Sequence, residues 1–307
     1  MNTGRNHFNS FGLVVLLIYS TFISRCTAPL SEKTEFPYNI REPSEKYVLQ
    51  HSLAEVSGLS FISDKEVALI QDEDGKIFYF DLGKGVVTRK IAFAKDGDYE
   101  DLKIAGDTAY IIRSDGKIFE ISNLSGTSAA VVHHKYVTGL SSQNDTEGLC
   151  YDDKHNRLLI ACKGSPGIDK KYKNNKAIYS FDLSSKKISD TPVYLINVNT
   201  VEKLAHGSHN SVLHNFMKLY RKIKESTFQP SGISIHPFTR DIYVISSTAN
   251  LLVVLDSLGT IKNVEKLSSS VFKQPEGIGF DSAGNMYISN EGRKGKGNIL
   301  KFLYLKK

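Results

Sequence analysis

The chain has 307 residues, of which 40% are hydrophobic and 23% are charged. This composition excludes an intrinsically disordered chain, which would have fewer apolar residues and a larger net charge. Lys and Arg outnumber Asp and Glu by 39 to 33, but they are scattered, with local excesses only at 218–224 and 293–296, so we predict no nucleic-acid binding.

The first 26 residues have the features of an export signal. Arg5 supplies a positive charge, and the apolar run of residues 11–23 is shorter than a membrane-spanning helix requires. Cys26 stands where a lipoprotein signal peptide places its acylated cysteine, although Arg25 departs from the small residue expected before it. We predict a lipoprotein-type signal peptide over residues 1–26, with Cys26 carrying the lipid. The alternative is ordinary cleavage, which would leave Cys26 as an incidental thiol.

A polar stretch follows at residues 27–45 and contains Pro29, Pro37 and Pro43. We interpret this stretch as a tether that holds the following domain away from its anchor. Residues 46–53 then have the pattern of a strand, and they open a domain that we expect to continue to residue 307.

A short motif recurs along the rest of the chain, each time at the start of a segment with strand character. Its five copies are Glu55-Val56-Ser57-Gly58-Leu59, Asp98-Tyr99-Glu100-Asp101-Leu102, Asp145-Thr146-Glu147-Gly148-Leu149, Gln229-Pro230-Ser231-Gly232-Ile233 and Gln274-Pro275-Glu276-Gly277-Ile278. The residue before the glycine position falls at 57, 100, 147, 231 and 276, which gives steps of 43, 47, 84 and 45 residues. Three of these steps match the period of a β-propeller blade.

Each repeat contains the pattern of four antiparallel strands. After the first motif they are expected at 66–71, 76–82 and 86–93, and the dipeptides Asp74-Gly75 and Asp115-Gly116 supply hairpin turns in two repeats. The last repeat has room for only three strands, and residues 46–53 can supply the missing one, which would remove the exposed edges of an open ring. We therefore predict an all-β fold, a five-bladed β-propeller of four-stranded antiparallel blades closed by an N-terminal strand.

The 84-residue step between the third and fourth detected blades predicts an insertion. Residues 193–198 complete the third blade as its fourth strand, and residues 208–225 carry apolar side chains at helical spacing. We expect a helical insertion at about 205–226, packed on the rim of the propeller. A sixth blade with a decayed motif is the alternative.

Two cysteines, Cys150 and Cys162, fall on neighbouring strands of one hairpin. The turn centres near Lys154 and His155, which places Cys150 opposite Leu159 and not opposite Cys162. We predict two buried free thiols and no disulfide between them.

The motif carries the chemistry, because the first strand of each propeller blade lines the central channel. Strict alternation along that strand places Glu276, Ile278 and Phe280 on one side and the glycines on the other. Glu100, Glu147 and Glu276 should converge near the axis, where partly desolvated carboxylates repel one another unless something compensates their charge. Two interpretations stay open: structural latches that accept hydrogen bonds from a neighbouring blade, and oxygen ligands for Ca2+.

The ordered alternation of Ser-Gly and Glu-Gly forms of the motif resembles the SdiA-regulated family of bacterial envelope proteins, which is distantly related to NHL-repeat propellers. The resemblance covers about residues 46–305. It implies a five-bladed propeller with a Ca2+ site, no established catalytic activity, and a lipid-anchored place in the bacterial cell envelope, in the periplasm or on the outer membrane. On the matching positions it favours Glu100, Glu147 and Glu276 as metal ligands, with Asp98 and Asp145 as second choices.

Members of this family often carry an acidic residue after the second strand of a blade, facing the channel mouth. Glu291 keeps that feature here, and Asp72 is acidic too, whereas Arg113 and Lys163 stand in the corresponding stretches of two other blades. We expect these four side chains at the channel mouth.

Two classes of function are compatible with the sequence. The first is a monomeric, membrane-anchored binding or scaffold module whose ligand, a protein or a small molecule, is unknown. The alternative is a metal-dependent hydrolase similar to lactonase or phosphoesterase propellers, in which a cation activates water. The sequence has no Gly-x-Ser-x-Gly elbow and no His-Glu-x-x-His helix, which favours binding over catalysis. The residues to test as general bases are Asp72, Asp115, His236 and Glu291.

Overall fold

The computed structural model describes residue 1 and residues 36–124, 133–167, 172–206 and 228–306. Contacts divide the chain into Met1–Glu35 and a compact unit, Phe36–Lys307. Every described helix and strand belongs to the second unit.

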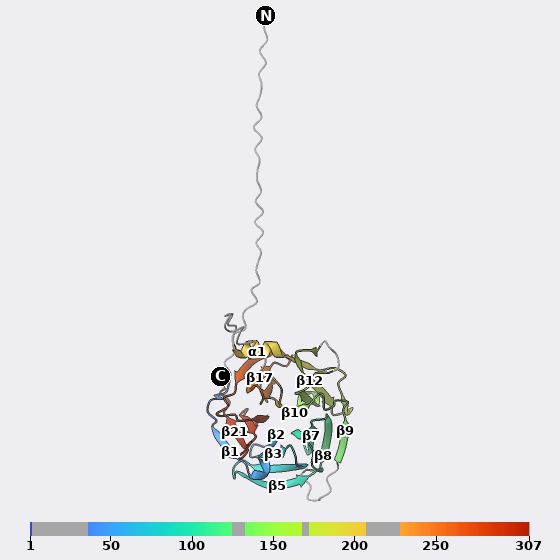
Figure 1. Ribbon diagram of the computed structural model, residues 1–307, viewed down its shortest axis with the longest axis vertical. Coiled ribbons are helices and arrows are strands. Elements are labelled where there is room, and N and C mark those ends of the chain that lie inside the picture. Colours follow the sequence, from blue (N-terminus) through green and yellow to red (C-terminus); the bar gives the residue numbers. More distant parts are fainter. Residues whose placement is uncertain (2–35, 125–132, 168–171, 207–227, 307) are drawn as a thin grey trace. The chain divides into compact units, whose positions relative to one another are not determined.

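Five antiparallel sheets stand around one axis, with β2 and β10 near the centre and β5 and β9 at the outer edge (Figure 1). The first blade consists of β2 (Val56–Ser63), β3 (Glu66–Gln71), β4 (Lys76–Asp81) and β5 (Val86–Ala92). The second consists of β6 (Tyr99–Ala105), β7 (Thr108–Arg113), β8 (Lys117–Ser122) and β9 (His133–Val137). The third consists of β10 (Thr146–Asp152), β11 (Arg157–Cys162), β12 (Asn175–Asp182) and an outer strand in two pieces, β13 (Lys187–Ile188) and β14 (Tyr194–Asn197).

The last two blades follow the same order from the inside outward. The fourth consists of β15 (Gly232–Ile235), β16 (Ile242–Ser246), β17 (Leu251–Leu255) and β18 (Ile261–Lys266). The fifth consists of β19 (Pro275–Phe280), β20 (Met286–Asn290), β21 (Asn298–Phe302) and β1 (Glu45–Val48). The prediction of five four-stranded blades is confirmed, and no sixth sheet occurs in the described residues.

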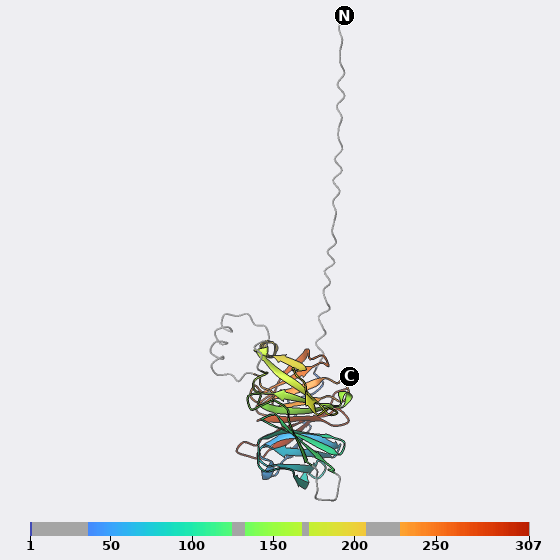
Figure 2. The ribbon, with the colours of Figure 1, turned by 90° about the vertical axis from the view of Figure 1, so that its right-hand side faces the viewer.

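The first strands of the five blades run in the same direction along the axis, because the starts of these strands line one pocket and their ends line another. We call these the acidic end and the opposite end of the propeller. Figure 2 shows the ring from the side.

One apolar residue of each motif anchors the core between two blades. These residues are fully buried, and each belongs to a different hydrophobic cluster: Leu59, Leu102, Leu149, Ile233 and Ile278. The repeated sequence therefore builds the hydrophobic core one interface at a time, and burying a side chain of this size contributes about 1.5–3 kcal/mol.

The ring closes as predicted, because β1 pairs with β21 and supplies the outer strand of the last blade. An ion pair between Lys301 and Glu45, 2.7 Å long, joins the two strands. The strand is shorter than the predicted residues 46–53: it ends at Val48, and His51–Leu53 forms a short 3-10 helix that buries Leu53. A second 3-10 helix, Asp153–His155, lies in the turn between β10 and β11.

The packed unit begins earlier than the predicted start at residue 46. Tyr38 is 4% exposed and belongs to the hydrophobic cluster of the fourth and fifth blades. Its hydroxyl donates a hydrogen bond of 2.7 Å to the carbonyl of Gly284, and the carbonyl of Pro37 accepts one from the amide of Leu305. Residues 36–45 are therefore part of the propeller unit and not of a tether.

The long step between the third and fourth blades contains a helix, α1 (Val198–His206), which begins earlier than the helical insertion predicted at about 205–226. It follows β14 directly. The predicted helix at 208–225 lies outside the described residues.

Both described cysteines are free and buried, as predicted, and Cys150 lies opposite Leu159 in the hairpin register. Within the described parts of the chain, no helix is long and apolar enough to span a membrane.

Candidate cation site at the acidic end of the axis

The three motif glutamates are the extra residues of three β-bulges. Between Tyr99 and Asp101, between Thr146 and Gly148, and between Pro275 and Gly277, the partner strand advances by one residue while the first strand advances by two. A bulge leaves its extra residue unpaired and turns its side chain away from the regular direction. The predicted alternation, with Glu276 on the same side as Ile278, is therefore wrong: Ile278 lies in the core, and Glu276 lines a pocket on the axis.

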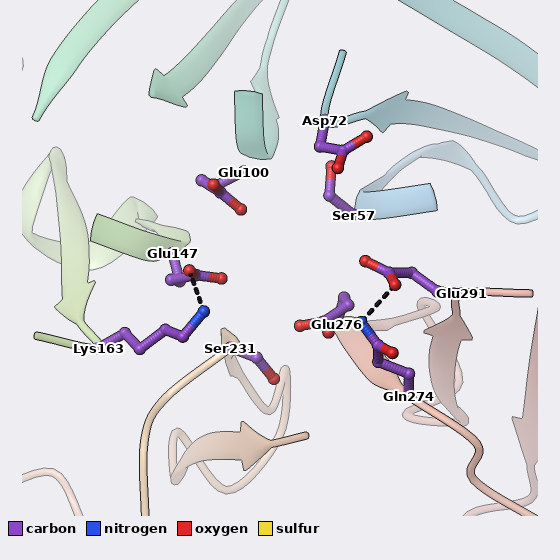
Figure 3. A pocket seen from close by; sticks show the side chains of 9 residues that line it. All are labelled: Ser57, Asp72, Glu100, Glu147, Lys163, Ser231, Gln274, Glu276 and Glu291. Atoms are coloured by element: carbon purple, nitrogen blue, oxygen red, sulfur yellow. Dashed lines mark hydrogen bonds and ion pairs between the residues drawn. The ribbon is translucent and has the colours of Figure 1, made fainter. Parts of the chain in front are cut away.

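This pocket, which we call the axial pocket, has a volume of about 160 Å³. Figure 3 shows that the side chains around it come from all five blades and approach from different sides. The lining residues are Ser57, Asp72, Glu100, Glu147, Lys163, Ser231, Gln274, Glu276 and Glu291. Among these described residues five carry carboxyl groups, and Lys163 alone carries a positive charge. The structure thus brings together the three glutamates that the sequence analysis expected to converge.

On one side of the axial pocket, Glu147 and Lys163 form an ion pair, with Nζ 2.7 Å from Oε1. Burial raises the pKa of Glu147, and the Lys163 ammonium and a hydrogen bond from Glu100 oppose that rise. Burial, followed by the charge of Glu147, raises the pKa of Glu100 well above its ordinary value. Burial alone would lower the pKa of Lys163, but Glu147 outweighs it and holds that pKa high. One carboxylate of the pocket is thus neutralised within the chain.

On the other side, oxygen atoms of Glu55, Asp72 and Glu291 lie within 4.8 Å of one another. Burial and the neighbouring acidic groups raise the pKa of Asp72 to about 6 and that of Glu291 to about 8. Asp72 Oδ1 is buried and has no hydrogen-bond partner among the described residues. Gln274 donates a hydrogen bond to Glu291 (Figure 3). This side therefore holds clustered carboxyl groups that disfavour one another's ionisation, and an unsatisfied acceptor.

Glu276 lies between the two sides in Figure 3 and is 9% exposed. Burial raises its pKa to about 7, the Glu147 charge adds to the rise, and hydrogen bonds from Gln274 and Ser247 oppose it. The latch interpretation applies instead to the two serines of the motif. Ser57 Oγ donates to the carbonyl of Tyr99 at 2.9 Å, and Ser231 Oγ donates to that of Pro275 at 2.8 Å. Each serine thus ties its blade to the next one.

The second-choice ligands, Asp98 and Asp145, do not line the axial pocket. Each stands two residues before the bulged glutamate of its strand, Glu100 or Glu147. The carbonyl groups of Asp98 and Asp145 accept hydrogen bonds from the amides of Ser114 and Lys163. Glu55 occupies the same place in the first blade, since its carbonyl accepts from the amide of Asp72. Sequence analysis missed Glu55, although its equivalence to Asp98 and Asp145 within the repeat was a signal that could have found it.

The four residues expected at the channel mouth divide into two groups. Asp72, Lys163 and Glu291 line the axial pocket. Arg113 does not: its guanidinium forms two hydrogen bonds with Asp115, of 2.9 and 2.6 Å. The hydrogen-bond pattern gives the equivalent place in the second blade to Ser114, one residue further along.

A buried ion pair, Asp101–Lys103, follows Glu100 on the same strand. Asp101 stands where the other four motifs have glycine, and its carboxylate accepts hydrogen bonds from Lys103 Nζ at 2.9 Å and from the amide of Leu149 at 2.9 Å. Lys103 Nζ also donates to the carbonyl of Leu59 in the neighbouring first blade. Lys103 lines the pocket at the opposite end, which has a volume of about 170 Å³.

A sequence model described as SdiA-regulated matches residues 38–293, well over half of the chain. The chain belongs to the SdiA-regulated family. No curated protein matches the sequence.

Solved structures share the fold of this SdiA-regulated protein at low sequence identity. A luciferin-regenerating enzyme is 9% identical, with 86% of this chain and 96% of that chain covered and a TM-score of 0.51. The glutaminyl cyclase of Myxococcus xanthus is 12% identical, with 85% and 94% covered and a TM-score of 0.54. At these identities the likeness shows the propeller fold alone.

In this SdiA-regulated protein, the four candidate general bases lie in three places. Asp72 and Glu291 line the axial pocket. Asp115 is held by Arg113 and Lys117, and the bonds from Arg113 contribute most to lowering its pKa. His236 is fully buried near the opposite end, where burial lowers its pKa to about 4. Only two of the four are thus placed to act on anything in the axial pocket.

Proposed function

We propose that this protein is an exported, lipid-anchored propeller that binds Ca2+ in the axial pocket and acts as a binding or scaffold module. The observation that carries this proposal is the charge imbalance of the axial pocket, with five carboxyl groups and one ammonium around a small, partly desolvated space. Carboxylates in such a space repel one another unless protons or a cation compensate their charge.

The donor set suits calcium. Ca2+ takes six to eight oxygen ligands in flexible geometry, and carboxylates, carbonyls and waters all serve. Glu55, Asp72 and Glu291 would hold the ion, since their oxygen atoms lie within 4.8 Å of one another and Asp72 Oδ1 has no partner among the described residues. Glu276 adjoins this set, and the predicted ligands Glu100 and Glu147 lie across the pocket. When bound, the ion would supply the positive charge that joins the ends of neighbouring blades.

The remaining parts of the proposal come from the residues of the N-terminus. The export signal and Cys26 support attachment to a membrane of the bacterial cell envelope, with the propeller on the exported side. Acyl chains inserted in a bilayer would anchor a domain that is otherwise soluble. The ligand, protein or small molecule, would reach the domain from the aqueous phase.

Calorimetric titration of the purified propeller with Ca2+ tests the metal site. We expect saturable heat for the wild type and at least a tenfold loss of affinity, about 1.4 kcal/mol, in Asp72→Asn and in Glu291→Gln. Glu147→Gln tests whether the ligand set that the sequence predicts, Glu100, Glu147 and Glu276, contributes to the Ca2+ affinity. The matched control is Asp190→Asn, which removes an exposed carboxylate far from the pocket in sequence and should leave the affinity unchanged.

Absence of Ca2+ heat in the wild type would contradict the metal site, and so would affinities in the two variants equal to that of the control. The proposal would then reduce to an acidic pocket whose carboxyl groups are compensated by protons and by Lys163.

The alternative function, a metal-dependent hydrolase, has one observation in its favour. The pKa values of Asp72 and Glu291, about 6 and about 8, bracket neutrality, where a general base works best. Assays with a lactone and a phosphate ester in the presence of Ca2+ test this alternative. Turnover that disappears in Asp72→Asn would favour the hydrolase over the binding module.

A further inference from the structure

The first residues of the propeller unit, from Phe36 onward, lie at the end opposite the axial pocket. Tyr38 contacts the turn between β19 and β20 through its bond to Gly284, and its ring lies 6.4 Å from that of Phe280, the last residue of β19. Phe280 lines the pocket at the opposite end, whereas Glu276, at the start of the same strand, lines the axial pocket. The side chain of His236, just after the end of β15, also contacts Tyr38.

The distance between the predicted lipid and this attachment point is short. Only residues 27–35 separate Cys26 from Phe36, and nine residues span at most about 30 Å in any conformation. The two ends of the propeller are separated by about one strand and its turns, and the first strands have four to eight residues, or about 13–26 Å. A flexible chain of nine residues has a typical end-to-end distance of only about 15–18 Å. The end of the propeller to which this chain is attached is therefore the one held nearest the membrane.

The surface at the opposite end also suits a lipid interface. In a four-stranded antiparallel blade, the turns after the first and third strands lie at the same end, which here places Phe238 and Leu258 on that face. Phe238 is 50% exposed, Leu258 is 85% exposed and Leu305, beside Pro37, is 54% exposed. Lys306 lies with Nζ 5.2 Å from the centre of the Phe238 ring. Apolar and aromatic tips with a nearby lysine are the groups that enter a headgroup region and meet its anionic phosphates.

We propose that this end of the propeller rests on the bilayer that holds its lipid anchor, so that the axial pocket opens away from the membrane. The occupant of the apolar face is the lipid surface itself. The turns of this end also carry aspartates, of which Asp81, Asp152 and Asp241 form ion pairs with Lys84, Arg240 and Lys262. Lys306 meets the anionic headgroups, and the carboxylates of the axial pocket lie away from them. The axial pocket then faces soluble cations and ligands. This inference rests on the proposed lipid anchor at Cys26.

Fluorescence quenching on vesicles tests this orientation. The mature lipidated protein is prepared as two variants, Leu258→Cys at the opposite end and Val137→Cys at the acidic end, where residue 137 is 76% exposed. Each is labelled with a thiol-reactive fluorophore, while Cys150 and Cys162 stay protected by burial. The vesicles contain phosphatidylethanolamine, phosphatidylglycerol and a headgroup quencher. We expect quenching at position 258 to exceed that at position 137 at least threefold.

The outcomes separate this inference from the anchor on which it rests. Protein that sediments with vesicles but shows equal quenching at both positions, or more at 137, overturns the orientation and leaves the anchor standing. Protein that does not sediment with vesicles overturns the anchor and the orientation together. Ca2+ titration is independent of both results.

A third variant tests the contribution of the surface. Phe238→Ser combined with Leu305→Ser, added to Leu258→Cys, should lower quenching at position 258 at least twofold while sedimentation persists. Both substituted side chains are about half exposed, so the fold should survive, and a thermal melt checks that it does. Unchanged quenching in a folded variant would contradict contact between this face and the bilayer.

Discussion

The carboxyl groups of the axial pocket differ in their electrostatic surroundings. Glu147 has Lys163 as a counter-ion, whereas Asp72 and Glu291 have raised pKa values because of burial and neighbouring acidic groups. The serines at the same motif position in two other blades form neutral hydrogen bonds to the next blade. Two blades are thus joined without charge, and the three glutamates gather carboxyl groups around the axis.

His236, at the opposite end of the propeller, makes the stability of the fold depend on pH. Its Nδ1 accepts hydrogen bonds from the amides of Phe238 and Thr239, and the ring packs against Tyr38 and Tyr304. Burial lowers its pKa to about 4, although the nearby Asp241 favours the charged form. A proton on Nδ1 would abolish both of these bonds, so the neutral ring is the one that the fold requires.

We predict that this histidine reduces stability in acid. Because the pKa of His236 is lower in the folded state than in the unfolded state, the unfolded chain binds the extra proton first, and stability is lost as the pH falls from about 6.5 to about 4. The loss should amount to about 1–3 kcal/mol. Urea unfolding across this pH range measures it, and His236→Asn, which keeps an acceptor for the two amides, should have a shallower dependence. If the free energy of unfolding depended on pH equally in the wild type and in His236→Asn, His236 would not be the residue that reduces stability in acid.

Among the secondary-structure elements, the first strands of the five blades approach one another closely because four of the five motifs contain glycine. A Cβ atom at Gly232 would lie 2.4 Å from the carbonyl oxygen of Glu276 in the next blade, and one at Gly277 would lie 2.8 Å from that of Ser57. Both contacts involve backbone, which cannot move aside without shifting a strand. The glycine therefore sets the spacing at which the bulged glutamates meet.

We predict that Gly232→Ala destabilises the propeller by at least about 2 kcal/mol, because the added methyl group overpacks the interface between the fourth and fifth blades. It should also weaken Ca2+ binding, since Glu276 lines the axial pocket. Urea unfolding and calorimetric titration measure the two effects. Gly83→Ala in an exposed turn is the matched control, with nothing closer than 3.3 Å to the new atom and an expected change within about 0.5 kcal/mol. Equal effects of the two substitutions would contradict a role in blade spacing.

The sequence was sufficient for the architecture and for the convergence of the three glutamates, because both follow from a repeated motif and its period. It was not sufficient for the bulges, since a bulge is defined by how two strands pair and not by either strand alone. The strict period of two therefore misplaced Glu276 relative to Ile278. Similarly, the Asp101–Lys103 ion pair depends on an aspartate that departs from the repeat, and its partner groups come from three different blades.

For the molecule as a whole, closure of the ring depends on its N-terminal segment in two ways. β1 covers the outer edge of the last blade, and Tyr38 fills the space below the turns of the fourth and fifth blades. The Tyr38 ring contacts the rings of residues in both of these blades and in the C-terminal segment: Tyr243, Phe280 and Tyr304. Both ends of the propeller unit are thus held by the same two blades, which favours opening of the ring as one cooperative event.

We predict that stability depends on residues 36–48 and not on the residues before them. A chain that begins at Phe36 should unfold at the same temperature as the mature protein, whereas one that begins at Leu49 should lose several kcal/mol, because a buried aromatic side chain alone contributes about 3–5 kcal/mol and a strand is lost with it. The exposed edge of β21 should also make the shorter chain associate. Circular dichroism melts and light scattering after gel filtration measure both effects. A monomeric chain from Leu49 with an unchanged melting temperature would show that the ring does not need this closure.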